Sequence, residues 1–212
     1  MEIMTYLHET LGLPKEVLTK PLLEVTEVRT LKKGELLIRQ GEEQSHVTFL
    51  VNGILRGFFL DAGGQEVTDC FAFRSGMSAM PGPDLTEPAP ISIEALTDVT
   101  VLCIPKDVVM RGMEEDMAFL KCAYELLTAS IKMHWQLKMA RYRYGASQRY
   151  QWFLESYPGL IHKVSNKHIA SFLDMNPSTL SRQKALLKDL MRKKRDEKCD
   201  TPCSPTALVS DQ

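Results

Sequence analysis

A polar segment near the C-terminal end of the chain carries side chains that can recognise nucleic-acid bases and phosphates. Arg182 can donate two parallel hydrogen bonds to guanine O6 and N7, and Gln183 can pair with adenine. Short hydroxyl side chains and lysines suit phosphate oxygens, which fix the position of a protein on a duplex without reading its sequence. The candidate contact residues are Ser178, Thr179, Ser181, Arg182, Gln183, Lys167 and Lys184.

The residues before this segment predict a short helix followed by a tight turn. The hydroxyl group of Ser165 can cap a helix start. Asp174 comes where the chain must leave this helix, and aspartate tolerates a left-handed backbone better than most residues other than glycine. Met175 is apolar and can fill the corner between the two helices. The apolar face of the first helix consists of Ile169, Ala170, Phe172 and Leu173.

A second helix is expected directly after the turn. Asn176 is a good helix N-cap, and Pro177 suits the first helical position, where a missing N–H costs nothing. Leu180 is expected to point back to the first helix, which leaves the polar residues facing outward. This pattern predicts a helix-turn-helix whose second helix enters a DNA major groove with its N-terminal end. A helix pair with small residues at its join is also common as plain structure, and that alternative stays open.

The charge distribution favours a polyanionic partner for this part of the chain. The net charge of −1 combines 11 basic and 20 acidic residues in 1–131 with 14 basic and 3 acidic residues in 132–195. The last segment, 196–212, has one basic and four acidic residues. A basic third on an acidic body indicates double-stranded DNA as the partner, and binding should weaken as salt rises. A charged, solvated surface is the other interpretation.

Length and composition fit a soluble protein of one or two domains. The chain has 212 residues, of which 44% are apolar and 25% are charged. It contains no apolar run of about 18 residues and no secretory signal, so we expect no membrane partner and a cytoplasmic location. Five scattered cysteines argue against a disulfide framework and fit a reducing compartment.

Residues 24–105 have the pattern of a β domain. Short runs of Val, Ile, Leu, Thr and Phe are separated by turn signals such as Asn52-Gly53. Strands at a spacing of about 8–12 residues predict a sandwich, jelly roll or barrel. Residues 75–90 are rich in proline and glycine and predict an irregular loop, while 91–105 supply one or two further strands.

Residues 106–143 predict a long helix in two pieces that join near Gly112. Apolar side chains recur at alternating spacings of three and four residues, as at the a and d positions of a coiled coil. Such a helix can pair with a second copy of the chain or pack on its own β domain, and the pattern supports both equally. The dimer-contact candidates are Phe119, Cys122, Leu126, Ala129, Met133 and Ala140, with Gln136 as the one polar member of the seam.

Residues from about 20 to 190 resemble the cyclic-AMP receptor protein/FNR (Crp/Fnr) family of bacterial transcription regulators. The stretch LLIRQGEEQSHVTFLVNGILRGFFLDAGGQE is similar to the family's early β-roll, and residues 113–143 fall where the family has its dimer helix. SNKHIASFLDMNPSTLSR resembles the family's helix-turn-helix, with Arg182 on its recognition-helix arginine. The resemblance implies a homodimer that reads a palindromic site with half-sites about one helical turn apart, with RNA polymerase as a further partner.

The resemblance also bears on the effector. Members that bind cyclic nucleotides hold the ribose with a Gly-Glu-Leu stretch and the phosphate with an arginine followed by Ser or Thr. The matching positions here are Ala79-Met80 and Ala89-Pro90. A buried phosphate without its arginine costs on the order of several kcal/mol. We therefore expect no binding of cyclic AMP and leave any other small effector open.

Two further features concern bound groups. Arg74 with Ser75 and Ser78 could form an alternative anion site, a fallback effector pocket in place of the family's cyclic-nucleotide site. The family's iron–sulfur members carry an N-terminal cysteine cluster, whereas the first cysteine here is Cys70, and no cofactor is predicted.

No signature of catalysis or of a metal site is found in the sequence. A nucleophile elbow, a phosphate-binding loop and a zinc-binding His-Glu-x-x-His are all missing. Cys199 and Cys203 offer two soft ligands, short of the usual four of a structural zinc site. We predict no metal, no catalytic residue and no enzyme activity.

Together these patterns predict an α+β protein with four parts. They are a cyclic-nucleotide-binding-like β-roll (jelly roll) sensor domain at 1–110, a dimerisation helix at 111–144, a helix-turn-helix DNA-binding domain at 145–195 and a flexible tail at 196–212. The predicted function is a homodimeric DNA-binding transcription regulator under the control of an unidentified effector. An effector-independent regulator and a protein-interaction scaffold built on the cyclic-nucleotide domain remain alternatives.

Overall fold

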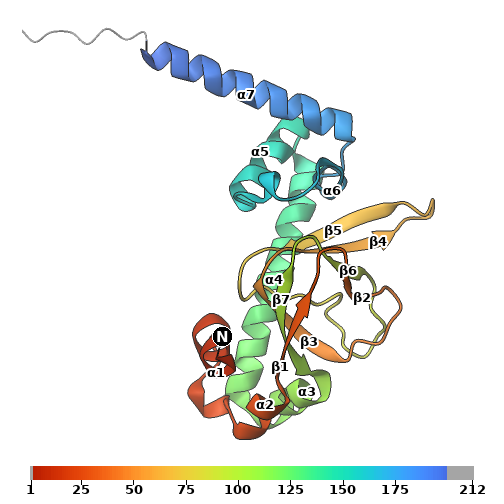
Figure 1. The fold of residues 1–212 in the computed structure, drawn as a ribbon, viewed down its shortest axis with the longest axis vertical. Coiled ribbons are helices and arrows are strands. Elements are labelled where there is room, and N and C mark those ends of the chain that lie inside the picture. The colour runs from red at the N-terminus through yellow and green to blue at the C-terminus, as the bar shows by residue number, and fades with distance from the viewer. Residues whose placement is uncertain (1, 200–212) are drawn as a thin grey trace, which may run out of the picture.

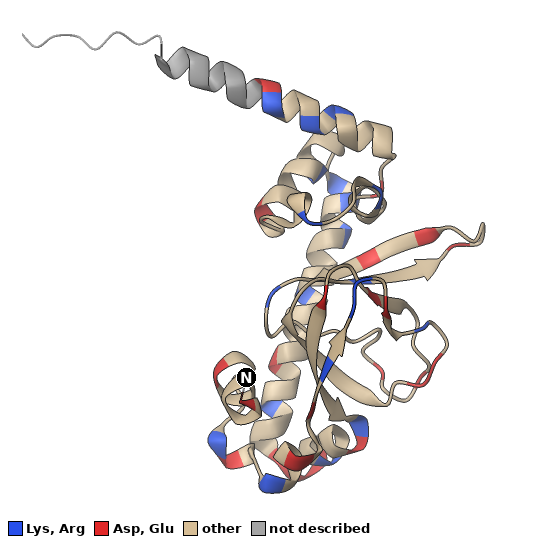
Figure 2. Cartoon of the chain, viewed as in Figure 1, with Lys and Arg blue, Asp and Glu red and all other residues tan. Residues whose placement is uncertain are grey.

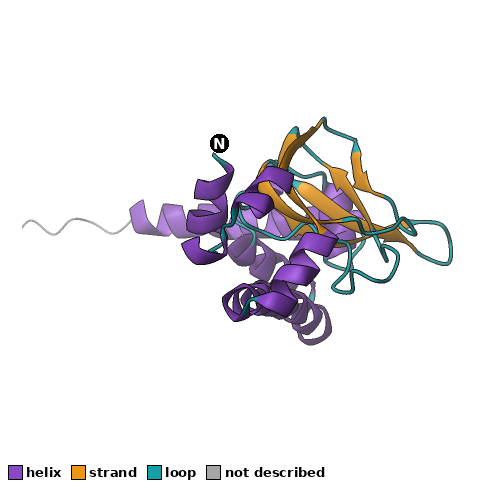
Figure 3. Cartoon of the chain, turned by 90° about the horizontal axis from the view of Figure 1, so that it is seen from below, coloured by secondary structure: helices purple, strands orange, loops and turns teal. Residues whose placement is uncertain are grey.

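The computed structural model describes residues 2–199, with side chains as far as Asp189. A long helix, α4 (Met117–Arg143), runs along the molecule from the N-terminal helices at one end to α5 (Ala146–Ser156) at the other (Figure 1). The strands gather on one side of the helices (Figure 3). The architecture is α+β, as the sequence predicts. None of the helices among residues 2–199 has both the length and the apolar content needed to cross a membrane.

The strands form two antiparallel sheets that make up the predicted β-roll. One sheet has the order β1-β7-β3 and the other the order β2-β6-β4-β5. The strands are β1 (Glu27–Leu31), β2 (Leu36–Ile38), β3 (His46–Asn52), β4 (Leu55–Leu60), β5 (Glu66–Ala72), β6 (Ser92–Ala95) and β7 (Val99–Pro105). Residues 75–90 are irregular, as predicted, apart from an isolated bridge between Phe49 and Ser78.

Apolar side chains from both sheets fill the interior of the roll. Leu50, Leu55 and Val101 are almost fully buried in this cluster. The turn between β3 and β4 needs a glycine, because Gly53 has φ of 101° and a Cβ there would lie 2.6 Å from the carbonyl oxygen of Asp98. The Asn-Gly signal therefore marks a turn with no room for a side chain.

Short helices at the N-terminus pack against the β-roll and the start of α4. They are α1 (Ile3–Thr5), the π-helix η1 (Tyr6–Thr10), the 3-10 helix η2 (Lys15–Val17) and α2 (Lys20–Val25). Their buried residues, including Tyr6 and Leu7, share one apolar cluster with Phe49, Phe119 and Cys122. The N-terminal segment therefore covers one side of the base of α4.

The long helical region breaks at Asp116. Helix α3 (Lys106–Glu115) ends there, and the Asp116 carboxylate caps α4 by accepting hydrogen bonds from the N–H groups of Ala118 and Phe119 at 2.7 and 3.0 Å. The predicted join near Gly112 is therefore wrong by four residues. Gly112 has a different role: a Cβ there would lie 3.2 Å from the Phe119 ring, so glycine lets α3 and α4 pack closely.

The remaining helices form a second compact unit. They are α5, the 3-10 helix η3 (Leu160–His162), α6 (Asn166–Phe172) and α7 (Pro177–Cys199). Their apolar cluster also includes Ile54 and Phe71 from the β-roll. The predicted tail begins at 196, but α7 continues to Cys199, and Cys203 lies outside the described residues.

Candidate nucleic-acid interface and pocket

The turn between α6 and α7 has the geometry that the sequence predicts. The Ser165 hydroxyl caps α6 by accepting a hydrogen bond from the N–H of His168 at 3.3 Å. Asp174 has φ of 52°, in the left-handed region. Ala170 and Leu180 are fully buried where the two helices meet, and Met175 packs on the same apolar cluster.

Main-chain hydrogen bonds close α6 in a Schellman motif around Asp174. The N–H of Met175 donates to the carbonyl of Ala170 at 3.0 Å, and the N–H of Asp174 donates to Ser171 at 3.1 Å. The Asp174 carboxylate also lies 3.8 Å from the guanidinium of Arg149 on α5. Local backbone bonds and packing on α5 thus fix the angle at which α7 leaves the turn.

The first turns of α7 present the predicted polar residues to solvent. Ser178, Ser181 and Arg182 are exposed, and Thr179 and Gln183 are half-buried. Lys184 differs from the others, because its ammonium group donates to the side-chain oxygen of Asn166 and burial lowers its pKa. This arrangement leaves Arg182 available for a duplex and ties Lys184 to the first helix.

Basic residues gather on the helical end of the molecule. Figure 2 shows Lys and Arg on the last part of α4 and on α5 to α7, while the β-roll carries many of the Asp and Glu residues. Lys167 on α6 is also exposed. The surface around the turn therefore combines positive charge with a protruding helix end.

The structure corrects the predicted dimer face of α4. Phe119, Cys122 and Ala140 are buried inside the same chain, with at most 9% of each residue exposed. Leu126 packs on the apolar cluster at the base of the β-roll. Phe119, Cys122 and Ala140 are therefore not available to a second copy of the chain, and Leu126 is partly covered.

A different stripe of α4 is exposed. Its large apolar members are Met117, Leu120, Tyr124, Leu127, Ile131 and Trp135. The first five alternate at spacings of three and four residues, so this stripe is itself a coiled-coil face. Ala129 is exposed and Met133 is half-buried, and neither belongs to this stripe. The apolar spacing of three and four residues occurs on two faces of α4. Only the burial of the side chains shows which face packs inside the chain and which is exposed.

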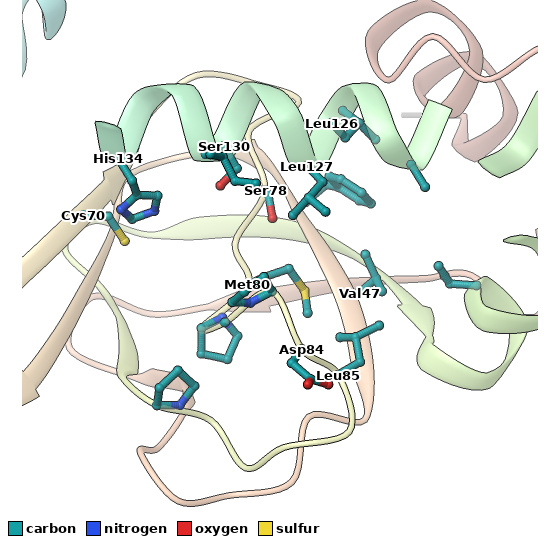
Figure 4. A pocket seen from close by; sticks show the side chains of 18 of the residues that line it. Val47, Cys70, Ser78, Met80, Asp84, Leu85, Leu126, Leu127, Ser130 and His134 are labelled. Carbon is teal, nitrogen blue, oxygen red and sulfur yellow. The ribbon is translucent and has the colours of Figure 1, made fainter. Parts of the chain in front are cut away.

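A large cavity lies between α4 and the β-roll. It has a volume of about 940 Å³, within the range of small-molecule sites. Helix α4 supplies a large part of its apolar wall, and strands β3 and β7, helix α3 and the 80–86 loop supply most of the rest. In Figure 4 the hydroxyl groups of Ser78 and Ser130 point toward the same part of the cavity, and His134 lies near Cys70.

The cavity does not assemble the fallback anion site. Ser78 lines it, but Arg74 and Ser75 line a separate cleft beside Pro158 and Lys163. The Arg74 guanidinium donates to the main-chain carbonyl of Ser156 at 3.4 Å. Arg74, Ser75 and Ser78 thus belong to two different places in the fold.

Charged groups lie at the edge of the cavity. Hydrogen bonds from Thr86 hold the pKa of Asp84 below its usual range. His134 Nδ1 lies 3.9 Å from a carboxylate oxygen of Asp69. Burial raises the pKa of the Cys70 thiol to about 12, so this thiol stays protonated at neutral pH. Among the side chains that the structure describes, residues 2–189, no three His, Cys, Asp or Glu groups gather as a metal site would require.

Sequence reasoning missed most of this pocket. The resemblance marked Ala79-Met80 and Ala89-Pro90 as the positions that hold a ligand in the family, and Met80 and Pro90 do line the cavity. Ser130 and His134 carry no motif, and they reach the cavity only through the packing of α4 on the roll.

Comparisons with known proteins agree with this architecture. Residues 28–116 match the family model of the cyclic nucleotide-binding domain. A segment of 126 residues is 29% identical to the transcriptional activator protein anr of Pseudomonas aeruginosa, covering 59% of this chain and 51% of that relative. The chain thus spans about half the length of that curated relative.

Solved structures share the fold over most of the chain. FixK2 from Bradyrhizobium japonicum gives a TM-score of 0.70 at 16% identity, covering 78% of this chain and 86% of FixK2. A Crp/Fnr-family regulator from Eubacterium rectale gives a TM-score of 0.62 at 16% identity, covering 82% of each chain. Residues 28–116 are thus of the cyclic nucleotide-binding type, and with its long helix and helix-turn-helix the chain is similar in fold to solved regulators of the cyclic-AMP receptor protein/FNR family.

Proposed function

We propose that this protein is a DNA-binding transcription regulator that reads a palindromic site as a homodimer. One observation carries the proposal: the N-terminal end of α7 is exposed on a rigid turn and presents Arg182 with short hydroxyl side chains. A recognition helix enters a major groove by this end. Such a regulator works in the cytoplasm, where bacterial chromosomal DNA lies.

The exposed side chains divide into two roles. Arg182 and Gln183 read base edges, Arg182 by a fork of donors to guanine and Gln183 by pairing with adenine. Ser178, Thr179, Ser181 and Lys167 contact phosphates, which fix the register of the helix on the duplex. Lys184 acts differently, because its bond to Asn166 holds the start of α6 against α7.

The exposed stripe of α4 supplies the dimer interface. Six large apolar side chains facing water form a patch that a second α4 would cover. Two copies related by a two-fold axis would place their α7 helices on successive major grooves, about 34 Å apart. RNA polymerase is a further partner that the family resemblance suggests.

An effector in the cavity would reach the helix-turn-helix through shared elements. Strand β5 contributes Asp69 and Cys70 to the cavity and Thr68 to the contact with α6. Helix α4 contributes His134 to the cavity and Arg141 to the same contact. A ligand that moves either element changes the placement of α6, which is a coupling between two sites. A regulator without an effector remains the second candidate, since the apolar stripe alone suffices for dimerisation.

A mobility-shift assay on DNA upstream of the protein's own gene tests the proposal. The wild-type chain is expected to shift a discrete fragment, and Arg182→Ala to lose the sequence preference while keeping weak general binding. If the preference survives in Arg182→Ala, the role given to Arg182 is wrong. If no duplex binds at low salt, the protein-interaction scaffold becomes the better description.

A further inference from the structure

The cavity beside α4 has a preformed wall. The segment from Met80 to Leu85 contains two prolines, and it is held by the buried amide group of Gln44, which donates to the carbonyls of Asp84 and Glu87 at 2.7 and 2.9 Å. A Cβ on Gly82 would lie 2.9 Å from the Pro90 ring, so this stretch packs tightly on the far end of the same loop. A site of this kind needs little rearrangement to accept a ligand.

The wall is mostly apolar. Strand and helix residues such as Val47, Ile104, Val109 and Leu126 surround the space, and Met80 projects into it (Figure 4). A ligand buried here gains free energy by removing apolar surface from water, and each unpaired polar group on it would cost free energy. The chemistry of the wall therefore favours a ligand with a large apolar fraction.

The charges around the cavity disfavour a phosphate. None of its described lining residues is an arginine. Lys138 and His134 lie at one side of the rim, and the carboxylates of Asp69 and Asp84 are also on the lining. The Asp84 carboxylate is fixed by hydrogen bonds from the N–H and the hydroxyl of Thr86 at 2.9 and 2.7 Å, so it remains ionised. An anionic ligand would meet like charge without a forked donor to compensate.

Two hydroxyl groups provide the polar recognition. Ser78 comes from the loop after β5, and Ser130 comes from α4. Figure 4 shows both hydroxyl groups pointing toward the same region of the cavity. A hydroxyl can donate and accept, so the pair suits a single neutral hydrogen-bonding group such as a phenol, an alcohol or a ketone.

We propose that this cavity binds an uncharged, mainly apolar small molecule with one hydrogen-bonding group held between Ser78 and Ser130, and that it excludes cyclic nucleotides. The proposal rests on the proposed function, because it names the chemical class of the effector of that regulator. The ligand would be enclosed by the β-roll on one side and by α4 on the other.

Fluorescence titration of the full chain with Nile red, a neutral apolar dye, tests the proposal directly. We expect saturable binding with a blue shift, at one dye per chain. Ser130→Asp introduces a charge into the cavity and should weaken binding by about tenfold or more. Thr128→Asp, on an exposed position of α4 outside the cavity, should leave binding unchanged. Equal effects of the two substitutions would overturn the proposal.

Three members of the exposed stripe, Leu127, Ile131 and Trp135, also line the cavity, so a second pair of variants separates the cavity from the rest of the stripe. Ala123→Trp fills the cavity from α4 and should reduce dye binding, whereas the matched Ala129→Trp should not. Tyr124→Ser removes apolar surface from the stripe and should leave the dye bound. Loss of binding in Tyr124→Ser with retention in Ala123→Trp would place the dye on the stripe and refute the proposal.

Competition decides between ligand classes. Cyclic AMP at millimolar concentration should neither displace the dye nor give heat in a calorimetric titration. Displacement by cyclic AMP would overturn the proposal. DNA binding is measured on the same samples, so the two accounts can fail separately: a chain that binds the dye in the cavity but no duplex supports the ligand class and refutes the regulator function.

Discussion

The guanidinium group of Arg141 donates two hydrogen bonds to the main-chain carbonyl oxygen of Phe172, at 3.0 and 2.7 Å. A third bond, at 3.2 Å, reaches the carbonyl of Thr68 on β5. Phe172 is the last residue of α6, and the Ser171 hydroxyl beside it accepts a hydrogen bond from the N–H of Thr68 at 2.9 Å. One arginine on α4 thus joins the first helix of the helix-turn-helix to the β-roll.

This contact gives a prediction about stability. Arg141→Ala removes charge-assisted bonds and leaves two main-chain carbonyls without their donor, so the free energy of unfolding should fall by about 1.5–3 kcal/mol. Urea denaturation measures the change. The exposed Arg143 provides the control, because Arg143→Ala should change stability by less than about 0.5 kcal/mol. Equal losses in both variants would contradict the role given to Arg141.

The exposed stripe of α4 gives a prediction about assembly. Tyr124 is 66% exposed in the single chain, and a partner helix would bury it. Tyr124→Glu places a charge in that interface and should weaken dimerisation by about 2 kcal/mol, or roughly 30-fold. Ala129→Glu tests the other face of the helix and should leave the dimer intact. Sedimentation equilibrium measures the dimer in both variants. If only Ala129→Glu dissociates the dimer, the interface is the seam predicted from the sequence and not the exposed stripe.

Arg182 gives a prediction about DNA recognition. Arg182→Ala should weaken binding to the preferred duplex by about 1–3 kcal/mol, and Arg182→Lys should recover charge without the forked geometry and so restore little of the preference. Lys167→Ala should weaken binding to all sequences alike and reduce the salt slope by about 0.9. Fluorescence anisotropy over a series of salt concentrations measures both effects. A sequence-dependent loss in Lys167→Ala would contradict its assignment to phosphate.

His168 gives a prediction about pH. Burial, with a further contribution from Arg56, lowers the pKa of this imidazole in the folded chain. The unfolded chain therefore binds a proton first as the pH falls, near the ordinary value of about 6.5. The free energy of unfolding contributed by this group is fully present above that pH and decreases as the pH falls through it.

The His168→Gln variant should remove this part of the pH dependence. Denaturation at a series of pH values between neutral and mildly acidic conditions measures the slope. His162→Gln serves as the matched control, because His162 is exposed. A slope that is unchanged in His168→Gln would show that other groups cause the acid sensitivity.

Local signals predicted the helix-turn-helix well. The cap at Ser165, the left-handed residue Asp174 and the buried Leu180 are all observed, since each depends on neighbours within a few residues. The long helix was predicted, but its break at Asp116 was not. Gly112 was interpreted as the join between the two helical pieces, but the helix continues past it. The glycine is explained by its close packing against the Phe119 ring.

The dimer face and the effector pocket could not be predicted from the sequence, because both depend on packing between distant segments. The face of α4 that contacts the β-roll and the face that is exposed have the same apolar spacing, and only tertiary structure assigns Phe119 to one and Tyr124 to the other. The pocket likewise unites Ser78 and Ser130 from distant segments, while Arg74 lies in a separate cleft. The spacing of residues in the sequence does not show which distant segments come into contact.

Selection of bound duplexes from a random DNA library by the purified chain tests the central claim most directly. The account predicts enrichment of a two-fold symmetric motif whose half-sites lie about one helical turn apart, with the enrichment lost in Arg182→Ala. Recovery of no enriched sequence, or of no DNA at all even at low ionic strength, would contradict it.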